Sequence, residues 1–505
     1  YFNMDPVSQA TKALSARKNS TDWTYINPST YIKPGSLNAN LKVSDYTPKT
    51  STEEKGIFFN KNLLKEGAPN IVTCSLGHNA HTTRCFNWVS VGYYDEYIWF
   101  TETSGDYSNV SNKFESFKTG DGRTASKNWN NAIYDRIRNI TTDGTAFTVH
   151  KFIKDFDEPI SGTTKTYYYK VGRDGAWTEE RSFTLRNRAD VIASGFNFLH
   201  VTDQQGFNNE EYESWRLSAE YINNDKGSNP YHFCLNTGDA TQNGNRINEW
   251  LDYFEAGKEI FKDTEQMYVV GNNDLSPEDP KVLGAGDDIS KINPINVNYF
   301  FTYELPYAIP TSSTGVFIPS VYSFVYGDTY FLAMNSEVTE IAREDIYADP
   351  EGTNVYTNQI KDWCIADLTA HAGDLNINWK VAYCHESPLT IITANLIMSY
   401  LIKDINGVYQ PQPTVQRGGS HLNTVGSYWF SQFLQDNAFK LCLCGHKHSF
   451  SNTRLVREDP TKTMEPIVYD PDGTNAAWYQ ALPDREKMCV QVSSTPGNYV
   501  KYVMN

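Results

Sequence analysis

Hydrophobic and polar positions follow two different patterns along this chain, and the pattern changes near residue 188. Between residues 70 and 187, apolar and polar side chains alternate in short runs that are separated by turn signals such as Asp174-Gly175. Alternation with a period of two predicts half-buried strands, and several of them in about 110 residues are typical of a β-sandwich. The expected strands cover residues 85–91, 96–101, 147–152, 165–172 and 182–185.

After a short polar link at 186–190, apolar runs of strand length alternate with amphipathic segments of helix length. This order is typical of an α/β fold, in which ligands bind at the carboxyl ends of the strands. Strands are expected at 196–202, 231–237, 266–270, 379–384 and 440–444, with a hairpin formed by 321–326 and 329–335. Helices are expected at 210–224, 248–260, 358–370 and 429–436.

The first 69 residues are rich in Ser, Thr, Asn, Lys and Pro and show little periodicity, which predicts an irregular arm. The expected organisation is therefore an arm at 1–69, a β-sandwich at 70–187 and an α/β domain at 188–505. Three histidines of the sandwich region, His78, His81 and His150, are expected to be ordinary surface or sandwich residues.

The net charge of −16 excludes the basic groove with which proteins bind nucleic acid, and it suits a protein that binds cations. No apolar run approaches the roughly 20 residues of a membrane-spanning helix, so no transmembrane segment is expected. Partner proteins are not indicated.

The compartment is read from the first residue, the glycosylation patterns and the cysteines. Tyr1 indicates either a removed signal peptide or a trimmed chain, and Asn19, Asn109 and Asn139 begin acceptor patterns for glycosylation. We therefore expect a secreted or cell-surface protein. Most of the eight cysteines lie in apolar runs and are expected to be reduced, whereas Cys74 and Cys85 are as well placed for a disulfide as for free thiols.

Candidate metal ligands follow five of the expected strands. If the sheet brings the strand ends together, carboxylate, amide and imidazole groups meet at one place, and that mixture suits Zn, Mn or Fe. A carboxylate shared by two ions would hold them ~3.5–4 Å apart, as in two-metal phosphate chemistry. The candidates are Asp203, Asp239, Asn272, His385, His446 and His448.

The motifs around these residues resemble those of the metallophosphoesterase (calcineurin-like phosphoesterase) superfamily. The motifs are Thr202-Asp-Gln-Gln, Gly238-Asp, Gly271-Asn-Asn-Asp, Cys384-His-Glu-Ser-Pro and Gly445-His-Lys-His. The chain is most similar to the purple acid phosphatase-like branch, which carries an amino-terminal fibronectin type III-like domain. Trp88 and the runs at 165–172 and 182–185 resemble that domain loosely. The resemblance implies a four-layer α/β/β/α sandwich.

The resemblance also implies a binuclear centre of Fe, Zn or Mn that hydrolyses a small phosphate ester with a metal-activated water. One ion would be held by Asp203, Asp239, Gln205 and His448, and the other by Asp239, Asn272, His385 and His446, with Asp239 bridging. Monoester, diester and pyrophosphate substrates all remain open, because they share this arrangement of metals.

Three residues depart from the family pattern. Gln205 stands where many relatives have His, Gln242 where the purple enzymes have a tyrosinate, and Asn273 where the family has a phosphate-orienting His. An amide donates a hydrogen bond but does not act as a general acid, so Arg417 or His421 are candidates to compensate. The alternative is a catalytically degenerate relative that acts as a binding or structural cell-surface protein. A carbohydrate or adhesion module is a third possibility, and it would need a second site.

Overall fold

The computed structural model describes residues 67–69, 71–92, 94–116, 139–140, 146–206, 210–225, 231–244, 247–275, 297, 300–303, 307–310, 317–336, 355–386, 389–390, 416–417, 430, 433–434, 436–446, 448, 451–454, 490–493 and 499–504. The arm expected at 1–69 lies almost wholly outside these ranges, as do Asn19 and His421.

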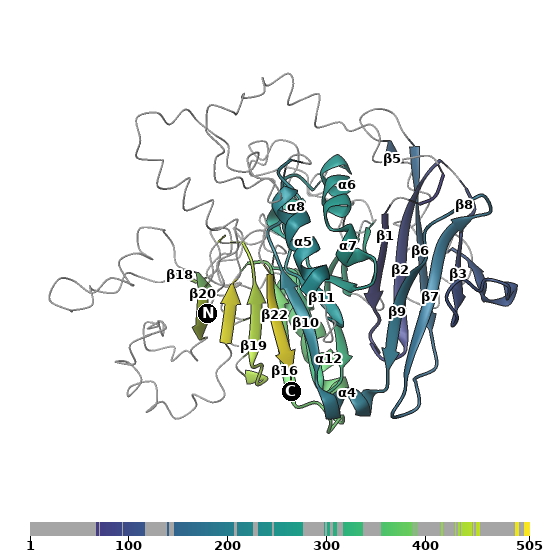
Figure 1. Cartoon of the computed structure of the whole chain (residues 1–505). Coiled ribbons are helices and arrows are strands. Elements are labelled where there is room, and N and C mark those ends of the chain that lie inside the picture. Colours follow the sequence, from purple (N-terminus) through teal and green to yellow (C-terminus); the bar gives the residue numbers. More distant parts are fainter. Residues whose placement is uncertain are drawn as a thin grey trace, which may run out of the picture.

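Two antiparallel sheets form the N-terminal part of the described chain, as the alternating pattern predicts (Figure 1). Their facing sides enclose a core of aromatic residues that includes Phe86, Trp88, Phe100 and Phe183. One sheet has the order β1 (Ile71–Leu76), β2 (Thr83–Val91), β6 (Ala146–Asp155), β5 (Asn139–Ile140). The other has the order β4 (Lys113–Glu115), β3 (Tyr97–Thr101), β7 (Thr164–Arg173), β8 (Ala176–Trp177), with β9 (Arg181–Arg186) also paired to β7 and the short η4 (Val110–Asn112) before β4.

Cys74 and Cys85 do not form a disulfide, because the register of β1 and β2 separates them. Cys74 lies opposite Phe86 and Cys85 lies opposite Ser75, so the two thiols project from opposite faces of the sheet. Both are buried, and neither takes part in a disulfide. The other cysteines in the described part of the chain are also buried and outside any disulfide, as expected from their apolar surroundings.

Two mixed sheets form the C-terminal part, and their strands agree closely with the expected ones. The first has the order β12 (Glu265–Tyr268), β11 (Phe233–Asn236), β10 (Phe196–Val201), β22 (Tyr499–Met504). The second has the order β13 (Tyr307–Pro310), β14 (Phe317–Tyr326), β15 (Thr329–Met334), β16 (Trp379–Cys384), β19 (Leu441–Cys444), β21 (Val490–Ser493), β20 (Ser451–Arg454). A small separate pair is formed by β17 (Leu389–Thr390) and β18 (Gln416–Arg417).

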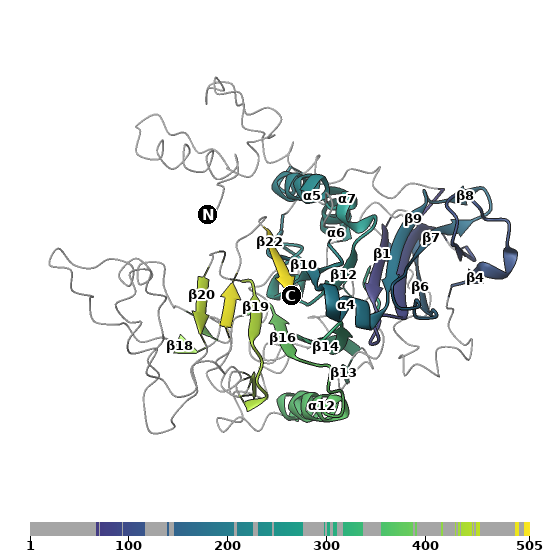
Figure 2. The same ribbon diagram turned by 60° about the horizontal axis from the view of Figure 1, so that its bottom comes forward.

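The two mixed sheets pack face to face and helices cover their outer sides, which confirms the four-layer arrangement. Phe198 and Phe233 of the first sheet meet Phe331 of the second edge to face, with ring centroids 5.6 and 5.3 Å apart. Figure 2 shows α12 (Val355–His371) on the outer side of the second sheet, and α5 (Glu213–Asp225), α6 (Ile247–Ala256) and α7 (Lys258–Phe261) on the opposite side of the molecule. Gly257 separates α6 from α7 within the helix expected at 248–260.

The link expected at 186–190 is wrong in one respect, because a short helix, α4 (Arg188–Ser194), begins inside it. Asn187 caps this helix, and its side-chain oxygen accepts a hydrogen bond of 2.9 Å from the backbone N–H of Ala189. An Asn at this position satisfies an otherwise unpaired N–H of the first turn. Among the helices that the structure describes, none is long and apolar enough to cross a membrane.

The β1-β2-β6-β5 sheet packs against β12, the edge strand of the first mixed sheet. Buried Arg84 of β2 donates to buried Glu265 of β12 at 2.7 Å, and the ammonium of Lys151 donates to the carbonyl of Phe301 at 2.8 Å. His81 joins the same two parts, because its Nδ1 lies 3.0 Å from the carbonyl of Arg186 and its Nε2 accepts the N–H of Gly327. The sandwich is therefore fixed to the α/β part by buried polar contacts.

Candidate metal centre

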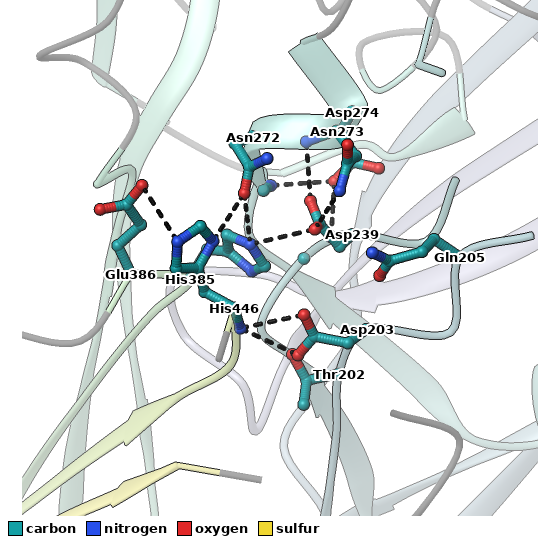
Figure 3. Close-up of polar contacts among 12 residues, drawn as sticks. Thr202, Asp203, Gln205, Asp239, Asn272, Asn273, Asp274, His385, Glu386 and His446 are labelled. Atoms are coloured by element: carbon teal, nitrogen blue, oxygen red, sulfur yellow. Dashed lines mark hydrogen bonds and ion pairs between the residues drawn. The ribbon is translucent and has the colours of Figure 1, made fainter. Parts of the chain in front are cut away.

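Five loops meet where the strands of the two mixed sheets end, and each contributes one or more of the candidate ligands (Figure 3). Asp203 follows β10, Asp239 follows β11, Asn272 follows β12 at the start of α8 (Asn272–Leu275), His385 follows β16, and His446 follows β19. The parallel pairing of β10 with β11 and β12, and of β16 with β19, aligns these ends. The structure thus brings together residues separated by almost half of the sequence.

The backbone is strained at four of the candidate ligands. Positive φ angles occur at Asp203 (54°), Asp239 (55°), His446 (71°) and His448 (50°), and the described chain has only one further non-glycine residue of this kind, Ala438. Such conformations persist only where surrounding contacts impose them, and they concentrate at functional sites. Here the N–H of Asp203 donates to the carbonyl of Gly238 at 3.0 Å, which ties one loop to the next.

Two glycines of the motifs allow the loops to approach each other closely. A Cβ at Gly271 would overlap the backbone N and the carboxylate of Asp239, and a Cβ at Gly445 would overlap the hydroxyl of Thr202 and crowd the carboxylate of Asp203. The glycines of the Gly-Asn-Asn-Asp and Gly-His-Lys-His motifs therefore have a steric role, because any side chain there would displace a candidate ligand.

Asp203, Gln205 and His448 form one half of the site. The carboxylate of Asp203 accepts the hydroxyl of Thr202 at 2.6 Å and the backbone N–H of His446 at 2.9 and 3.0 Å, and it lies 3.3 Å from Nε2 of His448. The hydrogen bond to Asp203 raises the pKa of His448. Nε2 of Gln205 lies 3.2 Å from the same ring nitrogen, and its Oε1 is buried without a hydrogen-bond partner in the described part of the chain.

Asp239, Asn272, His385 and His446 form the other half. Oδ1 of Asn272 lies 3.0 Å from Nε2 of His385 and 2.7 Å from Nδ1 of His446, and Oδ2 of Asp239 lies 3.3 Å from the same Nε2 of His385. Burial opposes ionisation of Asp239, but the charge of His385 and the hydrogen bonds from His385 and Asn273 lower its pKa below the ordinary value. The second half is thus an acidic group and an amide oxygen facing two imidazoles.

The protonation of His385 shows that these residues fit a cation. Its Nδ1 lies 2.7 Å from the carbonyl of Thr237, which can only accept, so Nδ1 carries the proton in the neutral ring. Nε2 faces two oxygens, Oδ1 of Asn272 at 3.0 Å and Oδ2 of Asp239 at 3.3 Å. A positive charge at this position, supplied by a proton on Nε2 or by a metal ion in its place, satisfies both oxygens. Oxygen and nitrogen ligands of this kind suit Zn, Mn or Fe.

The carboxylates of the two halves are close enough to act together. Ligand atoms of Asp203, Asp239 and His385 all lie within 4.8 Å of one another, and all three residues are buried. A buried pair of carboxylates is unfavourable without compensating cations, because desolvation and mutual repulsion both oppose their ionisation.

A family model described as calcineurin-like phosphoesterase matches residues 196–450, which is half of the chain and includes every candidate metal ligand. The chain belongs to the calcineurin-like phosphoesterase family. Family membership supports metal-dependent phosphoester hydrolysis as the chemistry of this domain.

Two solved structures are similar to the chain at low sequence identity. A purple acid phosphatase, PPD1 from yellow lupin (Lupinus luteus) seeds, has 14% identity and a TM-score of 0.48, and the match covers 77% of this chain and 60% of that protein. PhoD has 10% identity and a TM-score of 0.46, and the match covers 86% of this chain and 84% of that protein. The chain spans about 60% of the length of the lupin protein. No curated protein sequence matches it.

Asp274 is a buried residue of the phosphoesterase domain that the list of candidate ligands omits. Its carboxylate accepts the backbone N–H of Asp239 at 3.0 Å and of Gly271 at 2.9 Å, and the hydroxyl of Tyr268 at 2.5 Å. Burial and the charge of Asp239 raise the pKa of Asp274. It holds the loop of Asp239 against the loop of Asn272 from behind, and its place in the Gly271-Asn-Asn-Asp motif was the signal for this role.

The remaining departures and candidates have different outcomes. Asn273 donates to Asp239 twice, from its backbone N–H at 2.8 Å and from Nδ2 at 2.6 Å, and its Oδ1 accepts from Nε2 of Gln242 at 3.1 Å. Arg417 lies in β18, but its side chain is outside what the structure describes, and so is all of His421. Glu386, buried beside His385, has a carboxylate oxygen 3.7 Å from Nε2 of His446.

Proposed function

We propose that this chain is a phosphoester hydrolase that works with two metal ions held by the two halves of the candidate centre. The observation that carries the proposal is the convergence of buried ligand groups from separate loops, with ligand atoms of Asp203, Asp239 and His385 all within 4.8 Å of one another. Membership of the calcineurin-like phosphoesterase family supports the same chemistry.

In this proposal, Asp203, Gln205 and His448 hold one ion, and Asn272, His385 and His446 hold the other, with Asp239 bridging. The buried, unpartnered Oε1 of Gln205 supports its role, because a metal would supply the missing partner. When bound, the ions supply Lewis-acid activation of a water and positive charge that stabilises the phosphate oxygens. Zn, Mn and Fe all accept this ligand set.

The side chains around the ions have positioning roles. Asn273 fixes Asp239 through two hydrogen bonds, and Gln242 fixes Asn273 in turn. Because an amide is not a proton donor of useful acidity, Asn273 cannot protonate a poor leaving group. We therefore propose substrates with good leaving groups, such as aryl phosphate esters, as the ones this site hydrolyses fastest.

The remaining parts of the proposal concern organisation and location. We propose a fibronectin type III-like sandwich at 70–187 and a catalytic domain at 188–505. The two antiparallel sheets that precede α4 and share one core support this division. The acceptor pattern at Asn109, which is exposed and caps η4, supports a secreted or cell-surface location. An unmodified Asn109 in the intact mass of the native protein would count against that location.

The test is metal content and turnover of the purified chain, measured with Mn, Zn or Fe supplied. We expect close to two ions per chain and hydrolysis of a chromogenic aryl phosphate. Asp239→Asn and His446→Ala should each reduce turnover at least about 100-fold, because each removes a group that holds an ion. Asp362→Asn, an exposed position of α12, is the matched control and should leave turnover unchanged.

Each alternative outcome has a definite meaning. Chains that are folded but contain no metal and show no turnover would refute the proposal and favour a degenerate binding protein. Full turnover in Asp239→Asn would refute the assignment of the site while leaving hydrolysis itself established. The ratio of monoester to diester turnover would then define the substrate class.

A further inference from the structure

A second group of metal-ligating side chains lies apart from the candidate metal centre. His78 follows β1 in the sandwich, and Asp367 and His371 lie one turn apart on α12. Ligand atoms of the three residues all lie within 4.8 Å of one another, and all three side chains are half-buried. The α12 helix covers the outer side of the second mixed sheet (Figure 2). The candidate metal centre, in contrast, lies at the carboxyl ends of β10, β11, β12, β16 and β19.

We propose that His78, Asp367 and His371 bind one divalent transition metal ion of the Zn²⁺ class, separate from the catalytic ions. Two imidazoles and one carboxylate form a common ligand set for Zn²⁺, and a half-buried position leaves room for a water as the fourth ligand. Residues at i and i+4 on a helix project from the same face, so Asp367 and His371 are both available to one ion.

The surroundings hold the ligands in orientations that suit a metal. Nδ1 of His78 lies 3.3 Å from the carbonyl of Ser323, an acceptor that fixes the proton on Nδ1 and leaves a lone pair on Nε2. The hydroxyl of Tyr330 donates to Oδ2 of Asp367 at 2.6 Å, which orients the carboxylate and leaves Oδ1 for the ion. Outer hydrogen bonds of this kind are the usual support of metal ligands.

His371 provides an independent observation. Its Nε2 is buried and has no hydrogen-bond partner in the described part of the chain, and its ring lies 5.2 Å from the ring of His78, measured between centroids. Burial is the main cause that lowers the pKa of His371. A buried imidazole nitrogen without a partner is unfavourable, and an ion between the two rings would remove that penalty.

A neighbouring histidine shows what a purely structural imidazole looks like in this protein. Both ring nitrogens of His81 have partners, with Nδ1 against the carbonyl of Arg186 and Nε2 accepting the N–H of Gly327. Arg188, a cation whose charge acts on His371, is engaged by Asp374 at 2.6 Å and by the carbonyl of Gly327 at 2.8 Å. It therefore already has its own anion and does not take the place of an ion between His78 and His371.

The proposed ion would join the sandwich to the α/β domain. The carbonyl of His78 accepts the N–H of Val325 at 3.3 Å, so the turn that carries His78 already rests on β14. A shared ion would add a link from this turn to α12, which packs on the same sheet. A ligand that binds the folded protein alone raises the melting temperature, so this ion should stabilise both parts together.

The test uses equilibrium dialysis with Zn²⁺ on a full chain whose catalytic centre is disabled by Asp239→Asn and His385→Ala. We expect about one bound Zn²⁺ per chain, and at least tenfold weaker binding when His78→Gln or His371→Gln is added. Asp362→Asn on the same helix is the control and should keep the affinity. Zn²⁺ should also raise the melting temperature of the parent chain, and both histidine variants should lose that rise.

Two results would overturn the proposal. One is a disabled chain that folds and binds no Zn²⁺, and the other is unchanged binding in both histidine variants. If the disabled chain does not fold, the same substitutions are made in the otherwise unaltered chain. His78→Gln should then lose one of three Zn²⁺ ions and keep its turnover with Mn, whereas equal stoichiometry would refute the site. Loss of turnover with normal Zn²⁺ binding would concern the catalytic centre instead.

Discussion

Removal of Arg84 should destabilise the whole molecule, because it leaves a carboxylate buried between the sandwich and the α/β domain. The side chains of Arg84 and Glu265 are only 1% and 5% exposed, and Nε of Arg84 lies 2.7 Å from the carboxylate. The guanidinium also donates to the carbonyl of Ala80 at 2.7 Å, so it provides a hydrogen bond within the sandwich as well as the one to Glu265 of the α/β domain. Arg84→Met keeps much of the volume but removes every one of these donors.

The expected loss follows from the geometry. Breaking a buried ion pair by removing one partner costs about 3–5 kcal/mol. In a large domain, 1 kcal/mol shifts the melting temperature by about 2 °C, so Arg84→Met should lower it by about 6–10 °C. Lys258→Met is the control, because Lys258 and Glu255 form an ion pair whose side chains are 58% and 51% exposed. Its removal should change the free energy of unfolding by less than about 1 kcal/mol.

The loss should also depend on pH. Burial raises the pKa of Glu265 even with Arg84 beside it, and removal of Arg84 raises it further. A carboxyl whose pKa is higher in the folded than in the unfolded protein destabilises the fold as pH rises above about 4.3, the unfolded value. Differential scanning calorimetry should therefore show a smaller deficit at pH 4 than at pH 8. An equal deficit at both pH values, or one below about 2 °C, would refute the reasoning.

Two further predictions concern single sites. Gly445→Ala should reduce bound metal and turnover at least about tenfold, because its Cβ would overlap Thr202 and crowd Asp203. Gly373→Ala is the control and should change neither quantity, because the space around its Cβ is open. Full metal content in Gly445→Ala would contradict the steric argument. Burial and the charges of Glu249 and Glu255 raise the pKa of Asp252 to about 7, so its carboxylate destabilises the fold as pH rises above the unfolded value of about 3.9. Asp252→Asn should stabilise the protein by up to about 4 kcal/mol at pH 8 and by nothing at pH 4 in urea unfolding, and equal effects at the two pH values would exclude this origin.

The order of strands and candidate ligands could be predicted because each depends on a short, continuous stretch of sequence. Five of the expected strands are short apolar runs that are followed by a residue of a type that commonly binds metals, so Asp203, Asp239 and His385 stand out without any three-dimensional information. The cap of α4 was equally local, since Asn187 precedes a helix-forming segment, but seven residues carry too weak a period to be read as a helix.

Features that depend on register or on distant contacts could not be predicted. One residue of register decides whether Cys74 and Cys85 face each other, and period-two alternation does not specify it. Likewise His78 follows a strand of the sandwich and His371 ends a helix of the α/β part, and nothing in the sequence near either of them points to the other. Long-range packing alone places them together.

The strained backbone of the candidate centre shows how local sequence motifs and long-range packing act together. Four candidate ligands adopt positive φ angles that their side chains disfavour, and the cost is of order 1–3 kcal/mol for each. The surrounding structure offsets this cost through contacts between loops, such as the N–H of Gln205 on the carbonyl of Asp239 and the N–H of His446 on the carboxylate of Asp203. Each loop therefore reaches its ligand geometry only when its neighbours are in place. It follows that the sheets, and not the motifs alone, assemble the site, and that a packing defect as distant as Arg84→Met should weaken metal binding along with stability.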